Sequence, residues 1–341
     1  MFYKKIFIYL QSTNINTDMS REIVKIHGAE IVANSDSVKD WRGLVARFIS
    51  LEDVSQSSRA LYTRTLTQFF VWLEKTNRMD LFTSKLLNRT DILSYKDNLT
   101  EQGLSPLTIS SYLVVVRKFF TALESYNLYP NIAKGIKTPK KEKGFRKAHL
   151  TDNKSTELLT HSKENNSLRD YAIINLMLRT GLRTIEVTRA NVGDITYKGD
   201  RRILWVWGKG HDRKDNFVVL TDKAYLPIKE YLDNERKGAK SGEPLFISES
   251  IRNKGGRLTT RTISGIAKEN FRAIGIDSHE YTAHSLRHTT ACAILKHGGQ
   301  LTDAQGVLRH ASPVTTQIYT ASIEEELRLS KAPEMVLDNA F

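Results

Sequence analysis

The chain has 341 residues, 40% of them hydrophobic and 9% aromatic, and its 51 Lys and Arg outnumber 38 Asp and Glu to give a formal net charge of +13. This length and apolar content suffice for two buried cores, so we expect two domains. The single Cys292 excludes an intramolecular disulfide framework and a multi-cysteine zinc site. No apolar run approaches the ~18 residues of a membrane span. The excess of basic residues favours a polyanionic partner, most often nucleic acid.

Residues 1–36 form a predicted N-terminal extension with little helical or strand periodicity, a pattern compatible with disorder. Its first apolar patch ends at Gln11, and no small-residue cleavage site follows, so the patch is too short for a secretory signal. The internal Met19 leaves open a later start of translation.

Residues 37–136 predict an all-α domain of four helices. From Ser37 the apolar residues recur every three or four positions, and the serine-rich residues 55–58 separate a first amphipathic helix from a second. A third helix is predicted over residues 90–101. Ser105-Pro106 then supplies an N-cap with proline at the first position of a fourth helix.

Most of the excess charge lies in and just after this helical domain. Between residues 41 and 150 there are 18 Lys and Arg but 9 Asp and Glu. Residues 137–147 hold six of these basic residues, with one proline, one glycine and no apolar period, and they predict an exposed linker. The linker is either a solvated loop or a segment that follows a phosphate backbone while two domains close around a duplex.

The pattern after the linker predicts a mixed α+β domain over residues 148–329, followed by a tail over residues 330–341. Thr180-Gly-Leu-Arg183 marks the end of one helix and the start of another. Two β-prone runs are joined by a basic Gly-Lys-Gly loop, which is typical of a hairpin. The predicted helices cover residues 169–179, 224–237, 260–273, 284–297, 304–308 and 314–319, and the strands cover residues 203–207 and 217–220.

Four residues in this second domain suit cleavage of a phosphodiester without metal or water. The hydroxyl of Tyr319 can attack phosphorus and form a phosphotyrosyl ester. The guanidinium groups of Arg183 and Arg287 can hold the nonbridging oxygens through paired hydrogen bonds. Lys209, in the glycine-flanked loop, can donate a proton to the departing 5′-hydroxyl.

Two histidines extend this candidate set. His284 lies three residues before Arg287, so a helix places both on one face, where they can share a phosphate. His310 can donate to a nonbridging oxygen. Glu186, one turn after Arg183, either supports that guanidinium or is an acid on a helix surface.

A zinc site is the alternative for the paired histidines, because His284 and His288 have the spacing of the pattern His-Glu-x-x-His. Ser285 replaces the glutamate, and no third ligand has suitable spacing, so we expect no metal. His288 is then expected to face the core, and Cys292 to be a small apolar residue in a helix. His211, His279 and His297 are expected to be ordinary loop or surface residues.

Five motifs together resemble the tyrosine recombinase (phage integrase) family over residues 37–329. They occur in the family's order as Thr180-Gly-Leu-Arg183-x-x-Glu186, a hairpin lysine, His284-x-x-Arg287, Leu308-x-His310 and Thr315-Thr-x-x-Tyr319. The helical domain is similar to the family's core-binding domain, so the resemblance implies a four-helix, SAM-like domain and a mixed α+β catalytic domain. The short N-terminal extension favours a compact, Xer-like or transposon-type member.

The resemblance implies an activity, a partner and an assembly. Arg183, Lys209, His284, Arg287 and His310 form the activating set around Tyr319. The implied enzyme cleaves and rejoins double-stranded DNA at inverted-repeat core sites through a 3′-phosphotyrosyl intermediate and a Holliday junction. It works as a homotetramer or with a related recombinase, takes no cofactor, and belongs in the cytoplasm with the nucleoid. The residues beyond Tyr319, with Glu324-Glu-Glu-Leu-Arg-Leu and Met335-Val-Leu, are either an amphipathic tail that docks on a neighbouring protomer, as in the family, or a frayed terminus.

Three departures from the family pattern stand out. Arg309 occupies a position where the family often has glycine, Thr320-Ala321 replaces a frequent Thr-His, and the hairpin reads Gly-Lys-Gly-His-Asp-Arg-Lys. The hairpin sequence leaves Arg213 and Lys214 as alternatives to Lys209 for the acid.

Two other functions remain open. A type IB topoisomerase has the same nucleophile and cations, and would relax plasmids that lack a special site. A DNA-binding regulator could keep the fold and lose the chemistry, but all six polar positions are filled here, which argues against it.

Overall fold

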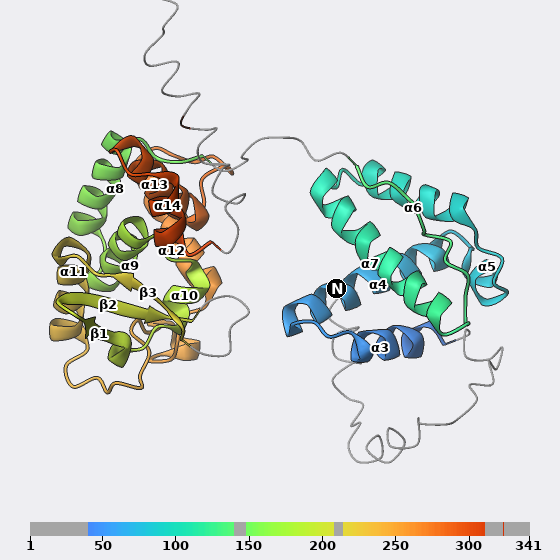
Figure 1. The fold of residues 1–341 in the computed structure, drawn as a ribbon, viewed down its shortest axis with the longest axis horizontal. Helices are drawn as coiled ribbons and strands as arrows, with labels where there is room; N and C mark the ends of the chain where they lie inside the picture. The colour runs from blue at the N-terminus through green and yellow to red at the C-terminus, as the bar shows by residue number, and fades with distance from the viewer. Residues whose placement is uncertain (1–39, 140–147, 208–213, 311–322, 324–341) are drawn as a thin grey trace, which may run out of the picture. The chain divides into compact units, whose positions relative to one another are not determined.

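The computed structural model describes residues 40–139, 148–207, 214–310 and Ile323. The chain divides into two compact units, residues 1–142 and 143–341, so the division falls within the predicted linker. Figure 1 shows helices alone in the described part of the first unit, and helices with a small sheet in the second. Each unit has its own hydrophobic core.

Residues 40–139, the described part of the first unit, contain the four predicted helices and one more. Serine and asparagine caps define their starts, since Ser55, Asn88 and Ser105 each accept a hydrogen bond from a backbone N–H of the following turn. The short additional helix buries Phe82 alone, which explains why its pattern is too weak to predict. The helices are α3 (Trp41–Leu51), α4 (Gln56–Lys75), α5 (Met79–Thr83), α6 (Arg89–Glu101) and α7 (Pro106–Ser125).

Aromatic side chains fill the core of the first unit. Phe70 stacks on Trp41 with ring centroids 4.6 Å apart, and it meets Phe82 and Phe119 edge to face. Such pairs contribute about 0.5–1.5 kcal/mol each beyond the area that they bury. By length and composition α7 could cross a membrane, but most of its apolar residues pack into this core, so we interpret it as a core helix.

The second unit combines helices with a three-stranded antiparallel sheet in the order β1-β2-β3. Ile195 pairs with Leu204 across β1 and β2, and Trp205 pairs with Phe217 across β2 and β3. The strands are β1 (Ile195–Lys198), β2 (Arg201–Val206) and β3 (Asn216–Val219). The helices are α8 (Asp152–Asn165), α9 (Leu168–Thr180), α10 (Thr184–Arg189), α11 (Asp222–Glu235), α12 (Thr260–Ala273), α13 (Ala283–Lys296) and α14 (Leu301–Leu308), with short 3-10 turns at Val192–Asp194 and Ile251–Asn253.

Helix α9 lies at the centre of this unit, with α8, α11, α12 and α13 packed around it. It is buried on almost every side, and even Asn175 lies inside, where its side chain donates to the backbone oxygen of Lys223 over 2.9 Å. Two helices meet at the carboxyl end of α9: α10 begins there, and α13 packs against α9. This end of α9 therefore positions the candidate site.

Candidate active site

A tight turn between α9 and α10 positions Arg183. Gly181 ends α9 with φ of +61°, and a Cβ at this residue would lie 2.6 Å from Cδ2 of Leu308, so both the backbone conformation and the close approach of α14 require glycine. Arg183 is the N-cap residue that directly precedes α10, and its backbone N–H donates to Oε2 of Glu186 over 2.8 Å. The same glutamate holds the side chain, with Nη1 of Arg183 2.9 Å from its Oε1.

Arg287 connects three elements from the first turns of α13. Its side chain is buried, at 1% exposure. Nη1 donates to the backbone oxygen of Gly181 and Nη2 to that of Leu308, each over 2.5 Å. Arg287 is thus fixed between the α9–α10 turn and the end of α14.

Arg183, His284 and Arg287 line one open pocket of about 290 Å³. Arg183 comes from the start of α10, and the other two from the start of α13, where His284 is exposed. The remaining lining residues are Leu182, Thr184, Ile185, Ser264, Thr282 and Ala283. Three of the predicted site residues are therefore brought together around a space open to solvent.

His310 belongs to the same electrostatic environment. Burial, followed by the positive charge of Arg287 and Arg183, lowers its pKa from 6.5 to about 4. The ring is therefore neutral at pH 7, so one nitrogen can donate a hydrogen bond and the other accept one. His284 and Arg309 also depress this pKa. His310 is thus coupled to both predicted arginines.

Glu186 and Arg309 form a buried ion pair beneath the pocket. Nη2 of Arg309 lies 2.7 Å from Oε2 of Glu186, with their side chains 8% and 1% exposed. Burial alone would raise the pKa of Glu186, but Arg309, then the backbone N–H and the charge of Arg183, hold it below its ordinary value. Glu186 therefore stays ionised and supports Arg183, the role that the sequence left open.

Sequence reasoning missed the part that Arg309 plays. Arg309 follows α14 with φ of +54°, a left-handed conformation that favours glycine. This conformation explains why the family often has glycine at this position. The Arg309 side chain reaches Glu186, 123 residues earlier in the chain. The sequence shows Arg309 at a position where glycine is frequent, but it does not show that Arg309 pairs with Glu186.

Lys209 and Tyr319 lie outside the described residues, as do Arg213, His211 and Thr320-Ala321. The alternative acid Lys214 is described, and its Nζ lies 2.5 Å and 2.6 Å from the two carboxylate oxygens of Asp194. This lysine is therefore engaged in an ion pair that anchors the base of the hairpin.

The remaining histidine expectations can be compared with the structure. His288 faces the core, at 1% exposure, whereas His284 lines the pocket, so the two do not form the paired zinc ligands of the alternative pattern. His279 and His297 are exposed, as predicted, and Cys292 is buried in α13.

The sequence and the fold match known proteins. Residues 148–326 match the phage integrase family. Tyrosine recombinase XerC of Pelobacter propionicus is 32% identical over 273 residues, covering 79% of this chain and 85% of the relative. XerC of Leptospira interrogans is 28% identical over 302 residues, covering 86% of this chain and 93% of the relative.

Two solved structures have a similar fold. XerH site-specific recombinase bound to its difH substrate in a pre-cleavage complex has a TM-score of 0.68 at 20% identity, and the match covers 89% of this chain and 97% of that one. The Tn1549 transposon integrase in complex with a circular-intermediate DNA has a TM-score of 0.64 at 19% identity, covering 84% of this chain and 98% of that one. Helices around a small antiparallel sheet are thus the shared architecture.

Proposed function

The chain belongs to the phage integrase family of tyrosine recombinases, and we propose how its residues carry out site-specific recombination, the cleavage and rejoining of DNA strands. The observation that carries the proposal is the pocket in which Arg183, His284 and Arg287 meet, with His310 coupled to them. A scissile phosphate is the ligand that such a group of donors suits best.

In this proposal Tyr319 is the nucleophile. Its hydroxyl oxygen attacks phosphorus, the bond to the 5′-oxygen breaks, and the 3′-phosphotyrosyl ester that forms keeps the energy needed to rejoin the strand. Arg183 and Arg287 stabilise charge on the nonbridging oxygens, since guanidinium groups stay charged throughout. His284 and the neutral His310 donate further hydrogen bonds to the phosphate.

Lys209 is our proposed acid for the leaving 5′-hydroxyl. The ion pair between Lys214 and Asp194 supports this choice over Lys214, because the Lys214 ammonium is held by both carboxylate oxygens of Asp194 and would have to leave them to reach the departing oxygen. Arg213 is a weaker candidate because a guanidinium does not lose its proton in proteins.

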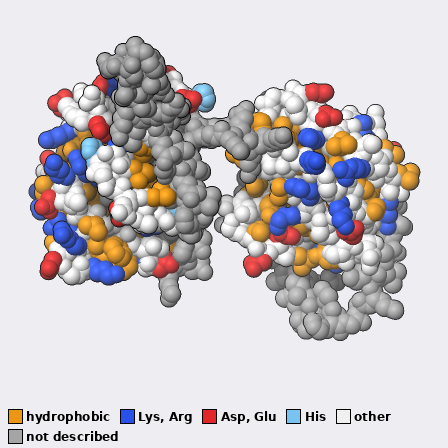
Figure 2. Space-filling view, turned by 45° about the horizontal axis from the view of Figure 1, so that its top comes forward, with side chains coloured by type: hydrophobic (Ala, Val, Ile, Leu, Met, Phe, Trp, Pro, Cys, Tyr) orange, Lys and Arg blue, Asp and Glu red, His pale blue; other side chains and the backbone are white. Residues whose placement is uncertain are grey.

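We propose that residues 37–136 are the core-binding domain and that the whole chain encloses duplex DNA. The surplus of basic residues over residues 41–150, which include the linker, supports the proposal, and Figure 2 shows Lys and Arg side chains across the visible face of the first unit. Among proteins of similar fold, a lambda integrase is described as a dimer bound to a core site. For this chain we propose inverted-repeat core sites and a synapse of four protomers in the cytoplasm.

A two-site plasmid assay tests the function. Inverted repeats near the gene of this protein, or at the ends of the element that carries it, are the candidate sites. Each repeat should be about 11 base pairs long, because one protomer covers one helical turn. The substrate plasmid carries two copies of such a site. We expect recombined plasmids that depend on both sites. Relaxation of a plasmid without any site would favour a topoisomerase, and binding without strand exchange would favour a regulator.

A further inference from the structure

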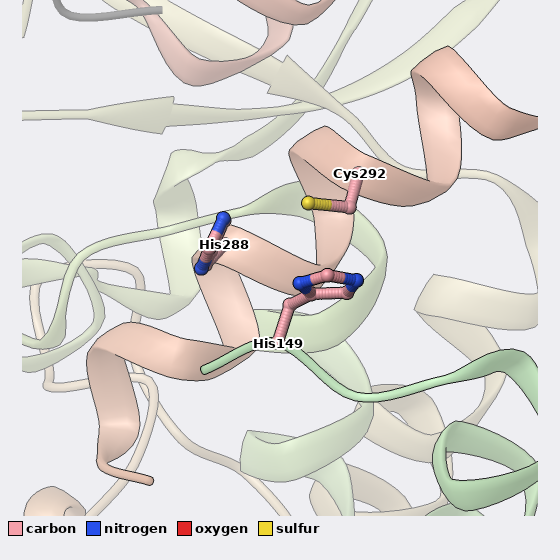
Figure 3. Close-up of side chains that lie close together, drawn as sticks. All are labelled: His149, His288 and Cys292. Atoms are coloured by element: carbon pink, nitrogen blue, oxygen red, sulfur yellow. The ribbon is translucent and has the colours of Figure 1, made fainter. Parts of the chain in front are cut away.

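A second cluster of chemically active side chains lies away from the candidate active site. Figure 3 shows His149, just before α8, beside His288 and Cys292 of α13. One ligand atom from each, an imidazole nitrogen or the sulfur, lies within 4.8 Å of the other two. His288 and Cys292 are each 1% exposed, and His149 is partly exposed.

The segment that carries His149 is held against α13 by its backbone. The N–H of Leu150 donates to Oγ1 of Thr289 over 2.9 Å, and the hydroxyl of Tyr281 donates to the backbone oxygen of His149 over 3.4 Å. His288 and Cys292 are four residues apart on one helix, so their side chains share a face. All three side chains are therefore positioned by the fold itself.

Two imidazole nitrogens and one thiolate form a ligand set that Zn²⁺ binds in proteins. Zn²⁺ binds nitrogen at about 2.0–2.1 Å and sulfur at about 2.3 Å, and it often takes three protein ligands and one water. Mg²⁺ and Ca²⁺ prefer oxygen ligands. A tetrahedral ion needs donor atoms about 3.3–3.8 Å apart, so small side-chain rotations from the observed geometry suffice.

We propose that His149, His288 and Cys292 bind a thiophilic divalent cation of the Zn²⁺ type. The ion would tie the residues that follow the linker to α13, whose first turns carry His284 and Arg287. The ion would take no part in the proposed catalysis, since none of the three ligands belongs to the proposed catalytic set, and its fourth position would be open to water. The proposal replaces the expectation of no metal, which rested on the His284 and His288 pair, and it does not depend on the proposed function.

Co²⁺ is the probe for this site, because thiolate coordination gives it a charge-transfer band that a histidine-only site lacks. The full chain, without an affinity tag, reduced and freed of metal by a chelator, is titrated with Co²⁺. We expect one equivalent to bind with that band and with the visible bands of a tetrahedral ion. Cys292→Ser should lose the charge-transfer band, and His149→Gln should weaken binding by more than about tenfold. Absence of the band from the natural chain, or an unchanged Co²⁺ affinity in His149→Gln, would overturn the proposal.

Two further measurements separate metal binding from a ring contact. The rings of His149 and His288 already pack edge to face, with centroids 5.1 Å apart, and this contact alone could explain their proximity. The control is His297→Gln, which alters an exposed histidine at the end of the same helix and should leave Co²⁺ binding unchanged. Circular dichroism checks that metal-free His149→Gln is folded. Zn²⁺ should raise the unfolding temperature of the natural protein and the control but not of His149→Gln, and equal stabilisation of all three would contradict the site.

Discussion

Replacing Glu186 with glutamine perturbs the charge network beneath the pocket. The carboxylate is 1% exposed, and its oxygens lie 2.9 Å from Nη1 of Arg183 and 2.7 Å from Nη2 of Arg309. Glutamine keeps the shape but leaves the buried Arg309 guanidinium without an anion. Removing one partner of a buried ion pair costs about 3–5 kcal/mol, and the more exposed Arg183 pair adds little. We expect Glu186→Gln to lower the free energy of unfolding by roughly 3 kcal/mol.

Urea unfolding measures this loss of stability. The unfolding is monitored by both circular dichroism and fluorescence, because the two units can unfold separately. The matched control is Arg309→Gly, alone and combined with Glu186→Gln. Glycine at position 309 removes the guanidinium that Glu186→Gln leaves without an anion, and it suits the φ of +54°. The double variant should therefore be more stable than Glu186→Gln alone. A change below about 0.5 kcal/mol in Glu186→Gln, or no recovery in the double variant, would refute the reasoning.

Two further predictions concern the turn before Arg183 and the titration of His310. Gly181→Ala should destabilise the second unit by about 1–3 kcal/mol. The loss should exceed that of Gly199→Ala, because Gly199 has a similar φ but nothing within 4 Å of an added Cβ. Equal losses of stability in urea unfolding would contradict the contact with Leu308. Since the pKa of His310 falls from 6.5 to about 4 on folding, its contribution to stability is complete above pH 6.5 and decreases as the pH falls toward 4. His310→Gln should flatten the pH dependence of the unfolding midpoint in that range, and an unchanged slope would count against the shift.

Much of the fold followed from helical periodicity and caps. The predicted bounds of α12 agree with the structure, since its apolar residues recur along one face, and Ser105-Pro106 starts α7 as expected. Helix α8 was not predicted because it buries only Leu158 and Ser162, which form no apolar period. Strand β1 was also missed, being four residues long with no buried side chain.

The candidate site was predictable where its residues lie in short motifs. The spacing of His284 and Arg287 places both on one helix face, and Arg183 belongs to the motif Thr180-Gly-Leu-Arg183; the turn at Gly181 and the start of α13 bring the three residues to one pocket. The links that fix them join distant residues. The partner of Glu186 lies 123 residues away, and Leu150 contacts Thr289 across 139 residues. Spacing along the chain carries no information on such contacts.

Covalent capture of DNA tests the central claim most directly. The full chain and its Tyr319→Phe variant are incubated with a nicked site from which the released fragment diffuses away, and the products are separated in a denaturing gel. We predict a protein–DNA adduct for the natural chain and none for Tyr319→Phe, which should bind the same site with unchanged affinity in a native gel. An adduct that persists in Tyr319→Phe would contradict Tyr319 as the nucleophile.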